Sequence, residues 1–83
     1  MRVSRDGIPV ALTPQEYRLL TYLALNRGRV VSKAELTEHI YHQAFEREAN
    51  SIEVLVGRVR RRVGPDIVHT HRGFGYLIER DRQ

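Results

Sequence analysis

Residues 50–79, with the sequence NSIEVLVGRVRRRVGPDIVHTHRGFGYLIE, constrain the fold of this chain most strongly. The first half repeats apolar residues at helical spacing, and the second half places a Gly-x-Gly turn between two short runs of β-favouring residues. Gly64 and Pro65 separate the halves, because a glycine followed by a proline ends a helix. The sequence therefore predicts an arginine-rich amphipathic helix followed directly by a β-hairpin.

The predicted helix over residues 50–63 has two distinct faces. Steps of about 100° per residue place four β-branched residues on one stripe, which we expect to be buried: Ile52, Val56, Val59 and Val63. The opposite face carries Ser51, Val54, Arg58 and Arg61. A helix is about as wide as the major groove of DNA, so this outer face is a candidate surface for reading base edges.

Positive charge is concentrated in the same segment. The chain has a formal net charge of +4 and a sequence pI of about 10.1. Residues 1–49 carry seven Lys or Arg and six Asp or Glu, whereas residues 50–83 carry seven Arg and four Asp or Glu. Thirteen of the fourteen cations are arginine, which makes paired contacts with phosphate and guanine, although GC-rich codon usage also favours arginine. We therefore expect the helix and hairpin to have an anionic partner.

Length and composition exclude several classes of protein. Eighty-three residues are enough for one small domain, which we assign to residues 1–83. The sequence contains no cysteine, which excludes disulfides and thiolate metal sites. No apolar run approaches the roughly 20 residues of a membrane span, and no secretory signal opens the chain, so we expect a cytoplasmic location.

The sequence holds no pattern typical of catalysis or of a cofactor site. It lacks a nucleophile–base–orienter set and a glycine loop that would hold phosphates ahead of a helix, so we expect neither an enzyme nor a cofactor. His69 and His71 would share one face of a strand and could bind a metal ion, yet no carboxylate or cysteine accompanies them at supporting spacing. Ordinary strand residues are the favoured interpretation, as they are for His39 and His42.

The first third of the chain predicts a hairpin and a helix. Residues 1–12 read as two short strands around a turn at Asp6-Gly7. Residues 13–16, Thr-Pro-Gln-Glu, form a capping box that starts a helix, and Gly28 is the expected left-handed cap at its end. The residues at helical spacing that should face a core are Tyr17, Leu20, Leu23 and Ala24.

The middle of the chain predicts a short strand and a second helix. Residues 29–31, Arg-Val-Val, form a short segment with two β-branched residues, which favours a small strand. Residues 32–35, Ser-Lys-Ala-Glu, repeat the capping box and start a helix that ends near Tyr41. Residues 42–49 lack periodicity and are predicted to be a loop, with a helical turn within it as the alternative.

The order of these elements is typical of one α+β architecture. Three helices, a short N-terminal sheet and a C-terminal β-hairpin form a winged helix-turn-helix, in which the second and third helices make the helix-turn-helix and the hairpin is the wing. The loop between the two helices is longer than the usual tight turn.

Four motifs in this order resemble the effector domain of OmpR/PhoB-type response regulators, the DNA-binding half of bacterial two-component regulators. The motifs are Leu12-Thr13-x-x-Glu16-Tyr17-x-Leu19-Leu20, Gly28-x-Val30-Val31-Ser32-Lys33-x-x-Leu36, Ile52-x-Val54-x-Val56-x-Arg58-x-Arg60 and Thr70-x-Arg72-Gly73-x-Gly75-Tyr76. The resemblance covers nearly the whole chain, and its most specific part is Arg-Gly-Phe-Gly-Tyr after a basic helix.

The resemblance implies how such a domain works. The helix over residues 50–63 enters the major groove, and Arg72 of the wing reaches the minor groove or the backbone. Two copies bind direct-repeat half-sites, usually as a head-to-tail dimer. The loop between the second and third helices contacts RNA polymerase, here through Phe45, Glu46, Arg47 and Glu48. A receiver domain with a phosphorylatable aspartate precedes the effector domain in this family, so we expect this chain to be a fragment that lacks it.

The candidate DNA-binding residues come from the helix and the wing. Arg58 is the candidate for a guanine edge, Val54 for a thymine methyl group, and Ser51 for a phosphate or a helix cap. Arg60 and Arg62 flank the outer face and meet phosphates or pair with acids. The complete set is Ser51, Val54, Leu55, Arg58, Arg60, Arg61, Arg62, Thr70, Arg72 and Tyr76.

Five positions leave the contacts of the helix and wing open. Gly57 stands where the family often has a larger polar or basic residue, and Leu55 stands where it often has a polar or aromatic one. His71 stands where a small aliphatic is common. Tyr76 has a hydroxyl suited to phosphate and a ring suited to packing. Phe74, at the tip of the wing, is either packed at a hinge or an exposed contact.

Three other functions fit part of the pattern. A winged-helix protein–protein module would show no salt-sensitive binding to duplex DNA. The cytoplasmic part of a membrane-anchored regulator would have a transmembrane segment elsewhere in its full-length protein. A histidine-dependent nuclease would cleave DNA only with a metal ion. The concentration of arginine on the helix and wing favours DNA binding.

Overall fold

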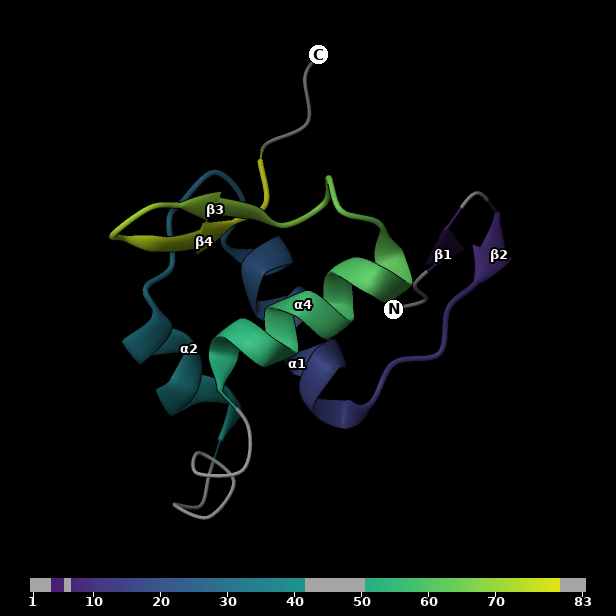
Figure 1. Cartoon of the computed structure of the whole chain (residues 1–83), viewed down its shortest axis with the longest axis horizontal. Helices are drawn as coiled ribbons and strands as arrows, with labels where there is room; N and C mark the ends of the chain where they lie inside the picture. The colour runs from purple at the N-terminus through teal and green to yellow at the C-terminus, as the bar shows by residue number, and fades with distance from the viewer. Residues whose placement is uncertain (1–3, 6, 42–50, 80–83) are drawn as a thin grey trace.

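A computed structural model describes residues 4–5, 7–41 and 51–79. Within them the chain forms three helices and two small antiparallel sheets (Figure 1). In chain order the elements are β1 (Ser4–Arg5), β2 (Ile8–Pro9), α1 (Pro14–Leu25), α2 (Lys33–Ile40), α4 (Ile52–Val63), β3 (His69–His71) and β4 (Gly75–Leu77).

Each helix starts at a side chain that caps its first turn. The hydroxyl of Thr13 accepts a hydrogen bond from the backbone N–H of Glu16 (3.2 Å), and the Glu16 carboxylate accepts one from the N–H of Thr13 (3.0 Å). This reciprocal pair confirms the predicted capping box of α1. Ser32 and Ser51 cap α2 and α4 through their hydroxyl oxygens alone. The predicted capping box at residues 32–35 is therefore only half formed, because the Glu35 carboxylate bonds to Arg29 and Tyr22 instead.

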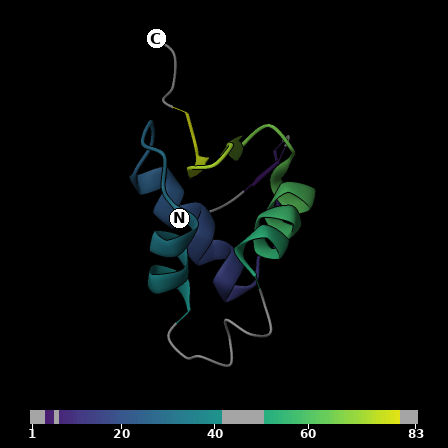
Figure 2. The same ribbon diagram turned by 60° about the vertical axis from the view of Figure 1, so that its left-hand side comes forward.

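The three helices enclose the core, with α1 between α2 and α4 (Figure 2). The buried apolar side chains come from all three helices and from the segments around the wing: Leu19, Leu20, Leu23, Val31, Leu36, Ile40, Tyr41, Ile52, Leu55, Val56, Val59, Val63, Val68, Tyr76 and Ile78. The predicted stripe of α4 is therefore confirmed. Since α4 packs against α1 and α2, its opposite face is directed away from the helices.

Strands β3 and β4 form the wing, a hairpin closed by Arg72, Gly73 and Phe74. Its register pairs Thr70 with Tyr76. The predicted strands, 67–70 and 76–79, lie too far from the turn. The observed pairing reaches one residue closer to it on each side, to His71 and Gly75. The left-handed conformation of Gly73 (φ 80°) closes the turn in the space of three residues.

The wing is fastened to the helices through Val31. The backbone N–H of Val31 donates to the carbonyl of Tyr76 (2.8 Å), and the N–H of Tyr76 donates to the carbonyl of Val31 (2.9 Å). The predicted strand at residues 29–31 is thus reduced to this single bridge, because the chain enters the cap of α2 at Ser32.

The two remaining turn predictions have different outcomes. The N-terminal hairpin is confirmed, with Arg5 paired to Ile8 and Gly7 at φ 79°. Gly28 is left-handed as expected (φ 81°), but α1 ends earlier, with Asn26 as its cap. The N–H of Gly28 instead donates to the carbonyl of Ile78 (2.8 Å), so this turn is tied to the end of β4.

Among the described residues, no helix is both long and apolar enough to cross a membrane.

Two glycine substitutions should change stability in opposite directions. A Cβ at Gly75 would lie 2.0 Å from the carbonyl oxygen of Val31, at a φ of +150°. We expect Gly75→Ala to lower the free energy of unfolding by about 1–3 kcal/mol.

A Cβ at Gly57, inside α4, would meet nothing within 4 Å. Gly57→Ala should raise stability by about 0.5–1 kcal/mol. Urea denaturation measures both, and a harmless Gly75→Ala would contradict the close approach of the wing to Val31.

Candidate nucleic-acid interface

The outer face of α4 presents the predicted polar and cationic side chains. Ser51, Val54, Arg58 and Arg61 are all exposed, and Val54 keeps 48% of its surface accessible. Their spacing of three or four residues puts them on one side of the helix. Figure 1 shows α4 crossing in front of α1, with the wing beside it. We call these four residues the outer face of α4.

Leu55 does not belong to this face. It is 1% exposed and packs in the core. The assignment of Leu55 to the DNA-binding set is therefore corrected. The signal was present in the sequence, because Leu55 lies three residues after Ile52 and four before Val59, both members of the buried stripe.

Arg60 joins α4 to the wing. Its Nε and Nη2 atoms donate to the carbonyl of Val68 (3.1 and 2.9 Å), and Nη2 also donates to the hydroxyl of Thr70 (2.7 Å). Its guanidinium carbon lies 6.0 Å from the ring centroid of Tyr76, which is 7% exposed. Three of the candidate DNA-binding residues, Arg60, Thr70 and Tyr76, are thus brought together as a joint between helix and hairpin.

Arg62 turns toward the start of α1. Its Nε lies 2.9 Å from a carboxylate oxygen of Glu16, and its Nη1 donates to the carbonyl of Ala11 (3.2 Å). The Glu16 side chain is 1% exposed, while that of Arg62 is 46% exposed. Of the two expectations for Arg62, pairing with an acid is the one that the structure confirms.

The tip of the wing is cationic and aromatic. Arg72 and Phe74 are exposed on either side of Gly73. Phe74 is 69% exposed, so of its two open interpretations the packed hinge is wrong. The His71 and Phe74 rings meet edge to face, with their centroids 5.0 Å apart. Among the described residues, no three His, Cys, Asp or Glu side chains are grouped closely enough to hold a metal ion.

A salt bridge links the starts of α2 and α4. The Nζ of Lys33 lies 3.0 Å from a carboxylate oxygen of Glu53, and both side chains are more than half exposed. The pair lowers the pKa of Glu53 and raises the pKa of Lys33. In such an exposed position the pair adds little stability.

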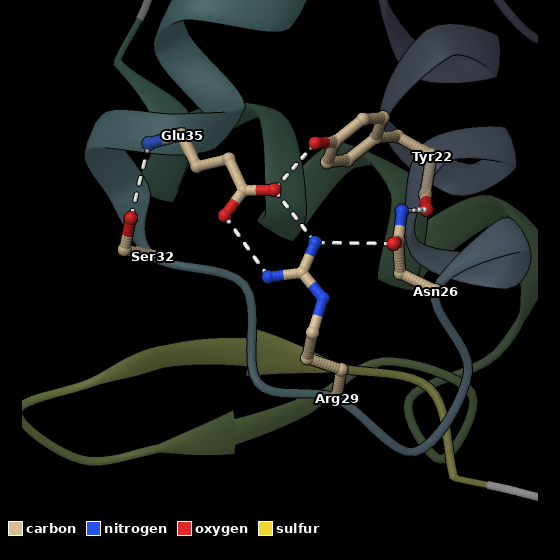
Figure 3. A network of polar contacts seen from close by, with 5 residues as sticks. All are labelled: Tyr22, Asn26, Arg29, Ser32 and Glu35. Carbon is tan, nitrogen blue, oxygen red and sulfur yellow. Dashed lines mark hydrogen bonds and ion pairs between the residues drawn. The ribbon is translucent and has the colours of Figure 1, made fainter.

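A polar network holds the α1–α2 turn (Figure 3). Arg29 donates to both carboxylate oxygens of Glu35 (3.1 and 2.6 Å) and to the amide oxygen of Asn26 (3.1 Å). The Tyr22 hydroxyl also donates to Glu35. This network occupies the Glu35 carboxylate, whereas Glu16 in the same position of α1 closes its capping box.

The network shifts the pKa values of two of its side chains, Glu35 and Tyr22. Hydrogen bonds from Arg29 and then from Tyr22 lower the pKa of the Glu35 carboxyl to about 2. The hydrogen bond to Glu35 raises the pKa of Tyr22. The turn that Arg29 and Glu35 hold leads directly to Val31, which pairs with the wing.

The candidate polymerase-contact residues, Phe45, Glu46, Arg47 and Glu48, lie outside the described residues. His42 lies outside them as well.

The chain is similar in sequence to bacterial transcription regulators. The pattern of a family described as "Transcriptional regulatory protein, C terminal" matches residues 7–78. The two-component response regulator PhoP of Pseudomonas aeruginosa is 51% identical in an alignment 74 residues long that covers 84% of this chain and 33% of that protein. The response regulator protein PmrA of the same organism is 40% identical over 78 residues, which are 94% of this chain and 35% of that protein. The chain thus spans about a third of these relatives.

The fold is similar to solved domains of the same kind. The DNA-binding domain of CpxR from E. coli superposes with a TM-score of 0.73 at 32% identity, covering 92% of this chain and 79% of that one. The C-terminal domain of the nisin resistance regulator NsrR gives a TM-score of 0.74 at 31% identity, covering 95% and 84%. The predicted winged-helix architecture is therefore confirmed.

The Glu35 carboxyl should titrate far below its ordinary range. Its folded-state pKa is about 2, against an ordinary value of 4.5. Because the folded pKa is the lower one, the stability that the network contributes is complete above pH 4.5 and is lost as the pH falls toward 2. NMR titration of the Glu35 carboxyl carbon measures this directly. In Arg29→Met the pKa should return toward 4.5, and a wild-type value near 4.5 would contradict the network.

Proposed function

The chain belongs to the family of C-terminal effector domains of OmpR/PhoB-type response regulators, and from this premise we propose that it binds double-stranded DNA sequence-specifically. In this proposal it is the output domain of a bacterial two-component transcription regulator. The relative CpxR supports the proposal, since the similar part of that protein is described as its DNA-binding domain.

The observation that carries the proposal is the outer face of α4 beside a cationic wing. Arg58 and Arg61 extend from a helix whose other side is buried in the core, so the helix can enter a groove without exposing apolar surface. The helix is about 10–12 Å across and the major groove about 12 Å wide. Arg60 holds the wing against α4, so both elements approach one duplex together.

We assign separate roles to the residues of the outer face. Arg58, in the middle of α4, contacts a guanine edge, and Val54 contacts a thymine methyl group. Arg61 neutralises a phosphate with release of counterions. Ser51 accepts a hydrogen bond from the N–H of Val54, which leaves its own hydroxyl hydrogen available for a phosphate at the helix start.

The wing supplies the second contact. Arg72 reaches the minor groove, whose negative potential is strongest where the groove is narrow. Thr70 accepts from Arg60 and can donate its hydroxyl hydrogen to a phosphate. Arg60, Arg62 and Tyr76 are left out of the proposed contacts, because their side chains serve the joint with the wing and the pairing with Glu16.

The family supports three further proposals about assembly. Two copies bind direct-repeat half-sites head to tail, residues 45–48 contact RNA polymerase, and a receiver domain controls the effector domain in the complete protein. The chain covers 33% of PhoP and 35% of PmrA, which leaves room in such relatives for a second domain.

Selection of bound sequences from random duplex DNA at near-physiological salt tests the proposed function. We expect enrichment of a direct repeat whose half-sites lie about one helical turn apart, roughly 10–11 base pairs. A protein–protein module would retain no duplex in a salt-dependent way. Binding that enriches no sequence would reduce the chain to a basic surface with general affinity for DNA.

Arg58→Ala should relax specificity at one base pair. Removing a bidentate arginine–guanine contact costs about 1–3 kcal/mol on the selected site and much less on a site with that base changed. Fluorescence anisotropy on the two duplexes measures both losses. An equal loss on every duplex would leave Arg58 as a phosphate contact. Arg61→Ala is the matched control, because the loss of a phosphate contact should weaken binding to every duplex without changing base preference.

Substitutions within Phe45–Glu48 should separate activation from binding. If these residues contact RNA polymerase, alanine replacements leave the affinity for the duplex unchanged and lower transcription in a purified system. Parallel loss of affinity and activation would refute the polymerase contact. Arg61→Ala provides the comparison, since it should lower activation only to the extent that it lowers DNA occupancy.

A further inference from the structure

Phe74 is a large apolar side chain held out at the end of the wing. It is 69% exposed and lies in the turn between β3 and β4. In Figure 1 this turn lies at one end of the long axis of the molecule, at the same end as α2, and Phe74 is not among the buried residues of the core. A phenylalanine in that position stabilises no part of the core, so its apolar surface is available to a partner.

The ring is held in place before any partner arrives. Gly73 has φ 80°, and the N–H of Phe74 donates to the carbonyl of His71 (2.9 Å), so the backbone of the turn is closed. The His71 ring then packs edge to face against the Phe74 ring at 5.0 Å. A side chain ordered in this way loses little conformational entropy on binding.

The surroundings of Phe74 indicate which partner it meets. Residues 67–78 contain His69, His71 and Arg72 and no Asp or Glu. An apolar tip within a cationic hairpin matches a DNA groove, in which phosphates line the rims and deoxyribose rings form apolar walls. A protein partner would have to combine an apolar pocket with an acidic rim, for which nothing on the wing gives a reason.

We propose that Phe74 contacts DNA, packing its ring against the sugar wall of the minor groove beside the nucleotide that Arg72 reaches. The inference rests on the proposed function and adds a residue to it. Arg72 contributes an ionic contact that weakens as salt rises, whereas Phe74 contributes apolar burial that does not depend on counterions. The wing therefore binds through one ionic and one apolar contact, and the salt dependence of the affinity distinguishes the two.

The salt dependence of binding tests this division. The affinities of the wild-type protein, Phe74→Ala and Arg72→Ala for one selected duplex are measured by anisotropy at several salt concentrations. Phe74→Ala should lose about fivefold to twentyfold in affinity at every salt concentration, with an unchanged slope of log affinity against log salt. Arg72→Ala should lower the magnitude of that slope by about one.

Two control variants make the result specific. Phe74→Leu keeps an apolar side chain and should recover most of the affinity. Ile8→Ala removes an equally exposed apolar side chain (67%) from β2, at the other end of the molecule in Figure 1, and should change nothing. Thermal unfolding should be the same for Phe74→Ala and the wild type, since Phe74 does not pack in the core.

The outcomes for the two proposals are distinct. If the wild type binds the duplex and Phe74→Ala binds equally well, Phe74 is not a contact and the proposed function stands. A changed salt slope in Phe74→Ala would also overturn the apolar contact. If the wild type binds no duplex at any salt concentration, the proposed function itself fails.

Discussion

The rest of the structure depends on the contact that the buried carboxylate of Glu16 makes between α1 and α4. It closes the capping box of α1 and pairs with Arg62 near the end of α4, at 2.9 Å. A carboxylate with 1% exposure is costly to bury without a cation, so α4 is stable in the orientation that brings Arg62 to it. That orientation decides which side of α4 faces the solvent, and so which residues a duplex can meet.

The arginines between residues 58 and 62 consequently serve two purposes. Arg60 and Arg62 point back to the protein, toward the wing and toward α1, whereas Arg58 and Arg61 are exposed on the outer face. Arg60 holds the wing against α4, and Arg62 holds α4 against the start of α1. In the proposed function, these two contacts set the position from which Arg58, Arg61 and Arg72 meet DNA. Under the proposed function, a change at Arg60 or Arg62 would therefore weaken DNA binding through the shape of the domain, because neither residue is among the proposed contacts.

The sequence predicts the elements of this domain better than the connections between them. Periodicity, caps and glycine turns identify three helices and both hairpins, because these are local effects of neighbouring residues. The partners of Arg60 and Arg62 are not local, and a long flexible side chain can curl back from an exposed-looking position. The single bridge at Val31 and the exposure of Phe74 likewise depend on how the wing meets the helices.

An NMR titration of the arginine Nε–H signals with a selected duplex tests the division of the arginines most directly. The account predicts that the signals of Arg58, Arg61 and Arg72 shift as the duplex is added. The signals of Arg60 and Arg62 should stay close to their positions in the free protein, since their guanidinium groups remain bonded to Val68 and Glu16. Large shifts at Arg60 and Arg62, with little change at the other three, would contradict it.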